Sequence, residues 1–339
     1  MRKYFLLFFL FLSYMFYSHV IWASNDSLHV DRKVRFHKEF ICRKKQCNKN
    51  QKIHFDTLQT YACEYNIEGC VLKAEHYNDD GSLFFKDVFS YREDGKLSGF
   101  KRYFFKNTLG NYSVMKYWKS GKISSRSFYN YLDELLNSSI FDENGNLLIQ
   151  TSFMSGRVDL KTFYKYNSRG EKLDSYMFNG EPWRDNLIEK VDSMPSLSES
   201  IHHTRFEYDA HGNVLKKVFL HCHERLIRYF TYKYDDHHNL IEEVEMKSKV
   251  DTIGCKRCLY DENNNKVREV YQYFKNSKLN TQVDYIYDDF DRLICEKKQK
   301  NDKITEKRYF YDEYGKLNRE DHLVNGEETK KVIYQNTYF

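Results

Sequence analysis

Aromatic and polar residues alternate along short stretches of this chain, and each stretch is followed by a polar turn. Phe206-Glu-Tyr208, Tyr232-Lys-Tyr234 and Tyr285-Ile-Tyr287 are three such stretches. Period-two alternation is typical of a strand that buries one face. The pattern therefore predicts β-strands joined by tight turns.

The stretches belong to a repeat in which an aromatic anchor precedes a polar turn and then an aliphatic residue. The tyrosine anchors are Tyr77, Tyr91, Tyr117, Tyr166, Tyr208, Tyr234, Tyr260, Tyr287 and Tyr311, and Phe141 takes the same place in one unit. The last five anchors are 26, 26, 27 and 24 residues apart. Self-similarity at a steady period predicts a repeat architecture.

The turns have a consistent chemistry. Asp or Asn often follows the anchor, where its side chain can accept hydrogen bonds from the backbone ahead of it. Three residues later, a type I turn with a following bulge needs positive φ, which Gly supplies and which His, Asn and Asp tolerate. These turn positions are Gly81, Gly95, Gly121, Gly145, Gly170, Gly212, His238, Asn264, Asp291 and Gly315.

Weaker turn signals at Ser155-Gly156, Asn276-Ser277 and Asn325-Gly326 fall between the main turns, so the chain is expected to meander. A single hairpin is marginally stable in water, and the units must therefore pack side by side. We expect an all-β fold of tandem antiparallel β-hairpins that forms an extended, twisted meander or open spiral sheet.

The repeat signature divides the chain into two blocks, 76–180 and 204–339. Residues 181–203 contain Pro182 and Pro195 and are expected to form a loop or hinge, because proline is disfavoured inside sheets. Residues 24–75 hold four cysteines, and we expect them to form a Cys-rich cap over the edge of the first hairpin.

The motif Tyr-Asp-x-x-Gly-x-Leu, with a Tyr two places upstream, resembles the YD repeat of bacterial surface and toxin-associated proteins. The same repeat is also called the RHS repeat. The resemblance covers roughly residues 76–180 and 204–339. It implies display outside the cytoplasm and roles in carbohydrate binding, cell contact or toxin carriage. The chain differs from the large toxin-associated members in being too short for their closed shell and in having no room for a C-terminal toxin domain.

The N-terminus has a basic start at Arg2 and Lys3 and an apolar run from Tyr4 to Trp22, the pattern of a secretory signal. We expect residues 1–23 to be a signal peptide cleaved after Ala23, which places the mature protein in the periplasm, on the cell surface or outside the cell. A retained anchor is the alternative, and is the one route by which we expect a membrane to be a partner. Without Arg2 and Lys3 the net charge falls from +5 to +3, which does not indicate a nucleic-acid partner.

Cysteine spacing raises two possibilities. In an exported chain an even number of cysteines favours disulfides, and the candidates are Cys42, Cys47, Cys63, Cys70, Cys222, Cys255, Cys258 and Cys295. The alternative is a zinc site and a zinc-dependent enzyme built on Cys222, Cys255 and Cys258. The adjacent pairs His202-His203 and His237-His238 would be poor chelates, because neighbours on a strand point to opposite faces.

The sequence contains no nucleophile elbow, phosphate-binding loop or His-Glu-x-x-His motif. We therefore predict no catalytic residues and no cofactor. The expected function is that of a non-enzymatic scaffold that binds a protein or glycan outside the cytoplasm. The alternative is an accessory or fragment of an RHS-type contact-dependent toxin system.

Overall fold

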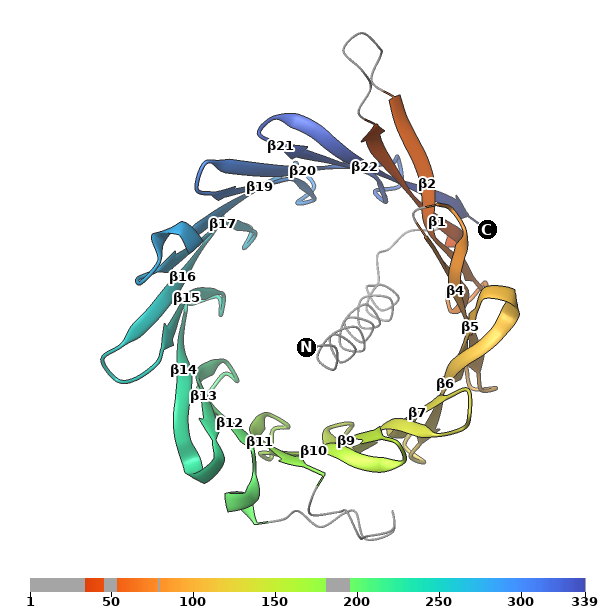
Figure 1. Cartoon of the computed structure of the whole chain (residues 1–339). Helices are drawn as coiled ribbons and strands as arrows, with labels where there is room; N and C mark the ends of the chain where they lie inside the picture. The colour runs from red at the N-terminus through yellow and green to blue at the C-terminus, as the bar shows by residue number, and fades with distance from the viewer. Residues whose placement is uncertain (1–33, 46–53, 79, 181–195, 339) are drawn as a thin grey trace.

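The computed structural model describes residues 34–45, 54–78, 80–180 and 196–338 (Figure 1). The expected signal peptide and its cleavage edge lie outside these residues. In the described part of the chain, no helix has the length and apolar character needed to cross a membrane.

The described residues form strands joined by short connections. The first eleven strands are β1 (Val34–Lys45), β2 (His54–Tyr65), β3 (Val71–Tyr77), β4 (Leu83–Tyr91), β5 (Leu97–Phe104), β6 (Thr108–Tyr117), β7 (Ile123–Asn130), β8 (Leu135–Phe141), β9 (Leu147–Met154), β10 (Arg157–Tyr166) and β11 (Lys172–Asn179). The others are β12 (His202–Tyr208), β13 (Val214–His221), β14 (Arg225–Tyr234), β15 (Leu240–Met246), β16 (Thr252–Tyr260), β17 (Lys266–Tyr273), β18 (Thr281–Tyr287), β19 (Leu293–Lys300), β20 (Lys303–Tyr311), β21 (Leu317–Val324) and β22 (Glu327–Tyr338). Among the described residues, four short 3-10 segments lie in connections: η1 (Phe105–Asn107), η4 (Leu197–Glu199), η5 (Cys222–Glu224) and η6 (Ser277–Leu279).

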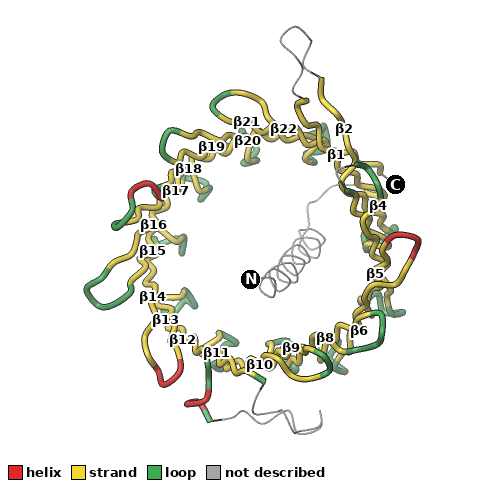
Figure 2. Tube along the Cα trace, in the orientation of Figure 1, coloured by secondary structure: helices red, strands yellow, loops and turns green. Residues whose placement is uncertain are grey.

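All 22 strands belong to one antiparallel sheet, which confirms the predicted all-β meander. Each strand pairs with the next along the chain, and β22 also pairs with β1, from Val34 opposite Tyr338 to Arg43 opposite Lys330. The sheet is therefore closed and not an open spiral, as Figures 1 and 2 show. Closure pairs the backbone groups that an open sheet would leave exposed at its two edges.

Residues 24–75 were expected to cap the first hairpin. Their described part does cover the edge of β3, but as two further strands of the same sheet, β1 and β2. β2 pairs with β3, and β1 pairs with both β2 and β22. Residues 66–70 form a turn of the repeat type, with Gly69 at φ 87°. The repeat therefore begins at Tyr65, one unit before the expected first block.

The sheet also continues across the expected hinge. Residues 181–195 lie outside the described part, but β11 and β12 on either side of them pair directly, with Asp174 opposite Arg205 and Met177 opposite His202. The two repeat blocks are consecutive parts of one sheet.

An antiparallel meander places alternate connections at opposite ends of the cylinder. We call one end the turn rim: it holds the ten turns at 66–70, 92–96, 118–122, 142–146, 167–171, 209–213, 235–239, 261–265, 288–292 and 312–316. The other end, the loop rim, holds the connections β3–β4, β5–β6 and so on to β21–β22. In the view along the axis, the turns of one rim project toward the axis and the loops of the other toward the outside (Figure 2).

Tyr77 and Gly81 are an exception within the predicted series. Their turn joins β3 to β4 and therefore lies on the loop rim, opposite the turn that follows Tyr91. The Tyr77 hydroxyl donates to Glu75, two residues away, and not to a neighbouring hairpin. Tyr65 takes the place in the 26-residue spacing that Tyr77 cannot fill.

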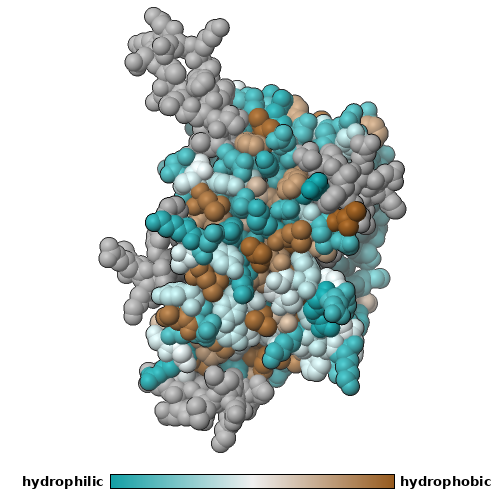
Figure 3. Space-filling view, turned by 90° about the vertical axis from the view of Figure 1, so that its right-hand side faces the viewer, coloured by the Kyte–Doolittle hydropathy of each residue, from teal (hydrophilic) through white to brown (hydrophobic). Residues whose placement is uncertain are grey.

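Buried side chains occur on both faces of the sheet. One cluster contains Cys63, Val71 and Ala74, and another contains Ile149, Phe163, Tyr176 and Phe178. On the wall near β4–β7, apolar residues appear as separate patches among polar ones (Figure 3). Stability must therefore come from many contacts between neighbouring hairpins.

Candidate functional site

The ten turns of the turn rim share one backbone geometry. In the turn after Tyr208, the N–H of Asp209 donates to the carbonyl of Asn213, and the N–H of Gly212 donates to the carbonyl of Asp209. The Asp209 carboxylate accepts the N–H groups of His211 and Asn213, each at 2.8 Å. All ten predicted turn positions have positive φ, including His238 at 65°, Asn264 at 63° and Asp291 at 58°.

Anchor tyrosines tie each hairpin to the preceding one. Each hydroxyl donates to the backbone carbonyl of the residue six positions after the previous anchor, over 2.5 to 3.1 Å. The donors are Tyr91, Tyr117, Tyr166, Tyr208, Tyr234, Tyr260, Tyr287 and Tyr311, and the acceptors, in the same order, are Val71, Leu97, Leu147, Lys172, Val214, Leu240, Lys266 and Leu293. Hydrogen bonding between units explains why the anchor is tyrosine.

Phe141 breaks this series because it has no hydroxyl. The carbonyl that its hydroxyl would reach belongs to Ile123, six residues after Tyr117. The indole N–H of Trp118 instead donates to the Phe141 carbonyl at 3.2 Å.

Neighbouring turns also contact each other, through the residue that ends one turn and the positive-φ residue of the next. Where the first side chain is long, the second residue is Gly. A Cβ at Gly121 would clash with Nζ of Lys96, and a Cβ at Gly212 would lie 2.9 Å from Oε1 of Glu171.

Where the first side chain is the shorter Asn, the second residue has a side chain that bonds to it. Asn213 meets His238 at 3.1 Å, and Asn239 donates to Asn264 at 3.1 Å. Asn265 donates to Asp291 at 2.8 Å. The three substitutions of Gly at positive φ are therefore matched to an Asn in the preceding turn.

In two turn pairs, Cys70 with Gly95 and Asn146 with Gly170, a short side chain faces a residue that has none. The nearest atom to a Cβ at Gly170 would be Oδ1 of Asn146, at 3.6 Å. A groove of about 820 Å³ lies between these two turns. Phe141, which takes the place of an anchor tyrosine, directly precedes the first of these turns, so the groove lies beside a departure from the repeat.

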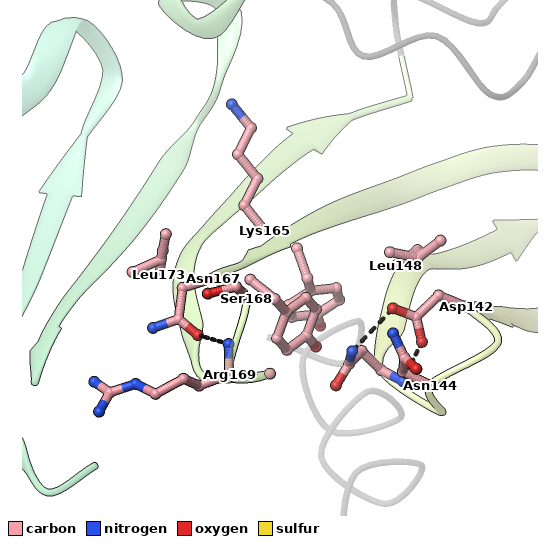
Figure 4. A pocket seen from close by; sticks show the side chains of 12 residues that line it. Asp142, Asn144, Leu148, Lys165, Asn167, Ser168, Arg169 and Leu173 are labelled. Atoms are coloured by element: carbon pink, nitrogen blue, oxygen red, sulfur yellow. Dashed lines mark hydrogen bonds between the residues drawn. The ribbon is translucent and has the colours of Figure 1, made fainter. Parts of the chain in front are cut away.

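The groove is lined by aromatic, aliphatic and planar polar side chains. Asp142 and Asn144 lie on one side, and Asn167, Ser168 and Arg169 lie on the other (Figure 4). The remaining lining residues are Asn146, Leu148, Tyr164, Lys165, Tyr166, Gly170 and Leu173. Sequence reasoning found the turns here but missed the groove. The sequence feature that could have pointed to the groove is the short Asn146 at the end of the turn before Gly170.

Hydrogen bonds fix the polar groups of the groove. Burial acts against the charged Asp142 carboxylate, but bonds from the side chain and backbone of Asn146 outweigh it and lower the Asp142 pKa. The Tyr164 hydroxyl donates to Gln150 at 3.1 Å, and burial raises the pKa of Tyr166. Neutral tyrosine rings beside fixed amide and carboxylate groups suit a ligand with both apolar faces and hydroxyl groups.

The cysteines do not gather into a site. Cys63, Cys70, Cys222, Cys255, Cys258 and Cys295 are free thiols, and the side chains of Cys42 and Cys47 lie outside the described part. The expected disulfides are therefore not formed among these six cysteines.

Cys255 and Cys258 are three residues apart on a strand whose register is unbroken between them, so they point to opposite faces of the sheet. They cannot bind one zinc ion together. No group of three or more potential metal ligands occurs among the described residues. The CxxC spacing suits a metal site on a turn, but not on a regular strand.

His203 has a structural role that the sequence did not reveal. Its side chain is fully buried, with Nε2 at 2.6 Å from Asp174 and Nδ1 at 2.9 Å from Glu224. The ring stacks on Tyr176 at 4.2 Å. His203 thus joins β11 and β12 to η5.

No family model and no curated protein matches the chain. Among solved structures it is similar to a Tc holotoxin pore of Photorhabdus luminescens, with 14% identity over 90% of this chain and 18% of that chain and a TM-score of 0.40. It is also similar to TcdB2-TccC3 (12% identity, 86% of this chain, 19% of that chain, TM-score 0.41). A porin-like protein from Bacteroides uniformis gives 10% identity over 88% of this chain and 96% of that chain, with a TM-score of 0.31.

The chain spans about one fifth of the length of the two Tc chains. At these identities and TM-scores the likeness assigns no function.

Proposed function

We propose that this protein is an exported, non-enzymatic YD-type repeat scaffold that binds a glycan or protein outside the cytoplasm, with a glycan seated in the groove between Asn146 and Gly170. The observation that carries the proposal is the groove itself. It lies between two neighbouring turns that face each other through the short Asn146 side chain and Gly170, directly after Phe141 takes the place of an anchor tyrosine.

Groove chemistry favours a glycan. The rings of Tyr164 and Tyr166 offer apolar faces against which a sugar ring can stack, and Asn144, Asn167 and Asp142 offer planar donors and acceptors for its hydroxyl groups. Departures from an otherwise consistent repeat are expected at functional sites, because a local mismatch is retained where it serves binding.

The test is binding of the full chain to a panel of bacterial and host glycans, compared with two groove variants. Tyr164→Ala removes a ring, and Gly170→Asn supplies the missing side chain opposite Asn146. Both are expected to reduce binding at least about tenfold, as loss of an aromatic contact in a small site does. The matched control is Tyr232→Ala, which removes the ring two residues before another anchor, away from the groove.

The glycan proposal would be overturned if the chain bound no glycan. It would also be overturned if Tyr232→Ala weakened glycan binding as much as Tyr164→Ala does. If the chain instead captured a protein partner, and Gly170→Asn abolished that capture, the scaffold role would stand and the ligand of the groove would be a protein.

A second proposal is that the protein is an accessory of an RHS-type toxin system. Closure of the 22 strands into one cylinder favours it, because the described sheet closes on itself despite the short chain. Growth inhibition on co-expression with a neighbouring secretion system would support this role, and a locus without such genes would count against it.

A further inference from the structure

The loop rim has a chemical character that the groove does not explain. At seven consecutive connections, from β5–β6 to β17–β18, one exposed apolar side chain lies either in the described part of the connection or within two residues of the end of an adjoining strand. These residues are Phe104, Leu132, Met154, Leu197, Leu226, Val250 and Phe274, with exposed fractions from 38% to 92%. An antiparallel meander brings all seven to the same end of the cylinder.

Positive charge accompanies these tips on one arc of the loop rim. The connections β15–β16 and β17–β18 contain Lys247, Lys249, Lys275 and Lys278, and Lys300 and Lys303 are the strand residues that flank the β19–β20 connection. The acidic residues of the three connections are Asp251 and Asp302. One lysine is paired, since Lys275 lies 2.8 Å from Asp251. Six positive and two negative charges leave this arc at +4.

The turn rim of the same hairpins has the opposite charge. The four turns 235–239, 261–265, 288–292 and 312–316 contain nine carboxylates, from Asp235 to Glu313, against Arg292 and Lys316. The charge is thus divided along the cylinder axis. Two copies could not meet loop rim to loop rim without opposing like charges on this arc.

We propose that the loop rim is a docking surface for an anionic lipid bilayer. The most exposed apolar side chains beside the lysines, Val250 at 92% and Phe274 at 60%, lie in neighbouring connections of the same arc, where both can meet one flat surface. Apolar tips at the headgroup boundary gain burial, and nearby lysines gain attraction to anionic lipids. The cylinder would then stand on the membrane with its turn rim and groove facing away.

This docking is independent of the glycan groove, which lies on the opposite rim. It also does not require a membrane anchor at the N-terminus, because the contacts come from loops between strands.

The test is co-sedimentation of the full chain with vesicles of phosphatidylcholine alone and with vesicles that contain phosphatidylglycerol. We expect binding to the anionic vesicles and at least about tenfold weaker binding to the neutral ones. The tip variant Val250→Asp/Phe274→Asp and the charge variant Lys275→Glu/Lys278→Glu should each weaken anionic binding at least about tenfold.

Phe290→Asp is the matched control. Phe290 is 77% exposed at the tip of turn 288–292 on the turn rim, so its replacement is equally exposed and should leave vesicle binding unchanged. Circular dichroism of each variant checks that the sheet is intact.

Failure of the wild-type chain to sediment with anionic vesicles would overturn the proposal. The proposal would also be overturned if the Phe290 variant lost as much binding as the tip variant. Full binding in the tip variant would overturn it too, because the chain would then attach to vesicles through another part.

Discussion

The hydroxyl of Tyr234 donates a hydrogen bond to the backbone carbonyl of Val214, 20 residues earlier, at 3.0 Å. Val214 begins β13, and Tyr234 ends β14, so the bond joins the turn ends of two successive hairpins. Seven other tyrosines repeat it. In a repeat protein such contacts between neighbours couple units that are weak alone.

Tyr234→Phe should lower the free energy of unfolding by about 1 kcal/mol, because it removes one neutral hydrogen bond and leaves the ring in place. Urea unfolding followed by circular dichroism measures the change. The control is Tyr131→Phe, since Tyr131 is 62% exposed at a loop tip. Equal stability of Tyr234→Phe and wild type would show that the interunit bond adds nothing.

Phe141→Tyr should have the opposite effect. The added hydroxyl is expected to reach the Ile123 carbonyl and raise the free energy of unfolding by about 0.5–1 kcal/mol. The same urea measurement applies. A destabilised Phe141→Tyr protein would indicate that the space near Ile123 is already filled.

Arg102→Met should destabilise the sheet strongly. Arg102 makes two bonds to Asp87, at 2.7 and 2.8 Å, and stacks over Phe85. Asp87 is 2% exposed, so the variant leaves a buried carboxylate without its cation and should cost about 3–5 kcal/mol.

Lys233→Met is the comparison for that variant. It breaks the pair between Lys233 and Glu242, in which Lys233 is 72% exposed, and should cost no more than about 1 kcal/mol. Similar losses in the two variants would contradict the special role of the buried pair.

Acid should loosen the turn rim. The Asn213 side chain lowers the pKa of Asp209, and the Arg292 side chain lowers the pKa of Asp288. A carboxyl whose pKa is lower in the folded state stabilises the fold above its unfolded pKa of about 3.9, and this stabilisation is lost as pH falls through the folded pKa.

We therefore expect the free energy of unfolding to begin to fall below about pH 5, and the fall to be shallower in Asp209→Asn, which keeps an acceptor without the charge. Chemical unfolding at a series of pH values checks this. An acid limb of the same slope in both proteins would exclude Asp209 as a contributor.

Local chemistry explains how much of the fold could be predicted. Asp209 and Gly212 define a turn within five residues, and the alternation up to Tyr208 defines the strand before it, so both are visible without tertiary contacts. His238, Asn264 and Asp291 were recognisable as turn residues because these types tolerate positive φ. The turn at Asn66–Cys70 was missed although Tyr65, Asn66, Gly69 and Val71 occupy the same positions as in the other units.

The sequence by itself determined the strands, the turns and their order, because each depends on contacts within about ten residues. Only the tertiary structure decided that β22 meets β1 and that Asn146 faces Gly170 beside a groove. The first depends on how the small twist and offset between neighbouring strands accumulate around the sheet, and the second depends on how two adjacent hairpins are set against each other. Neither relationship can be read from the sequence of one hairpin alone.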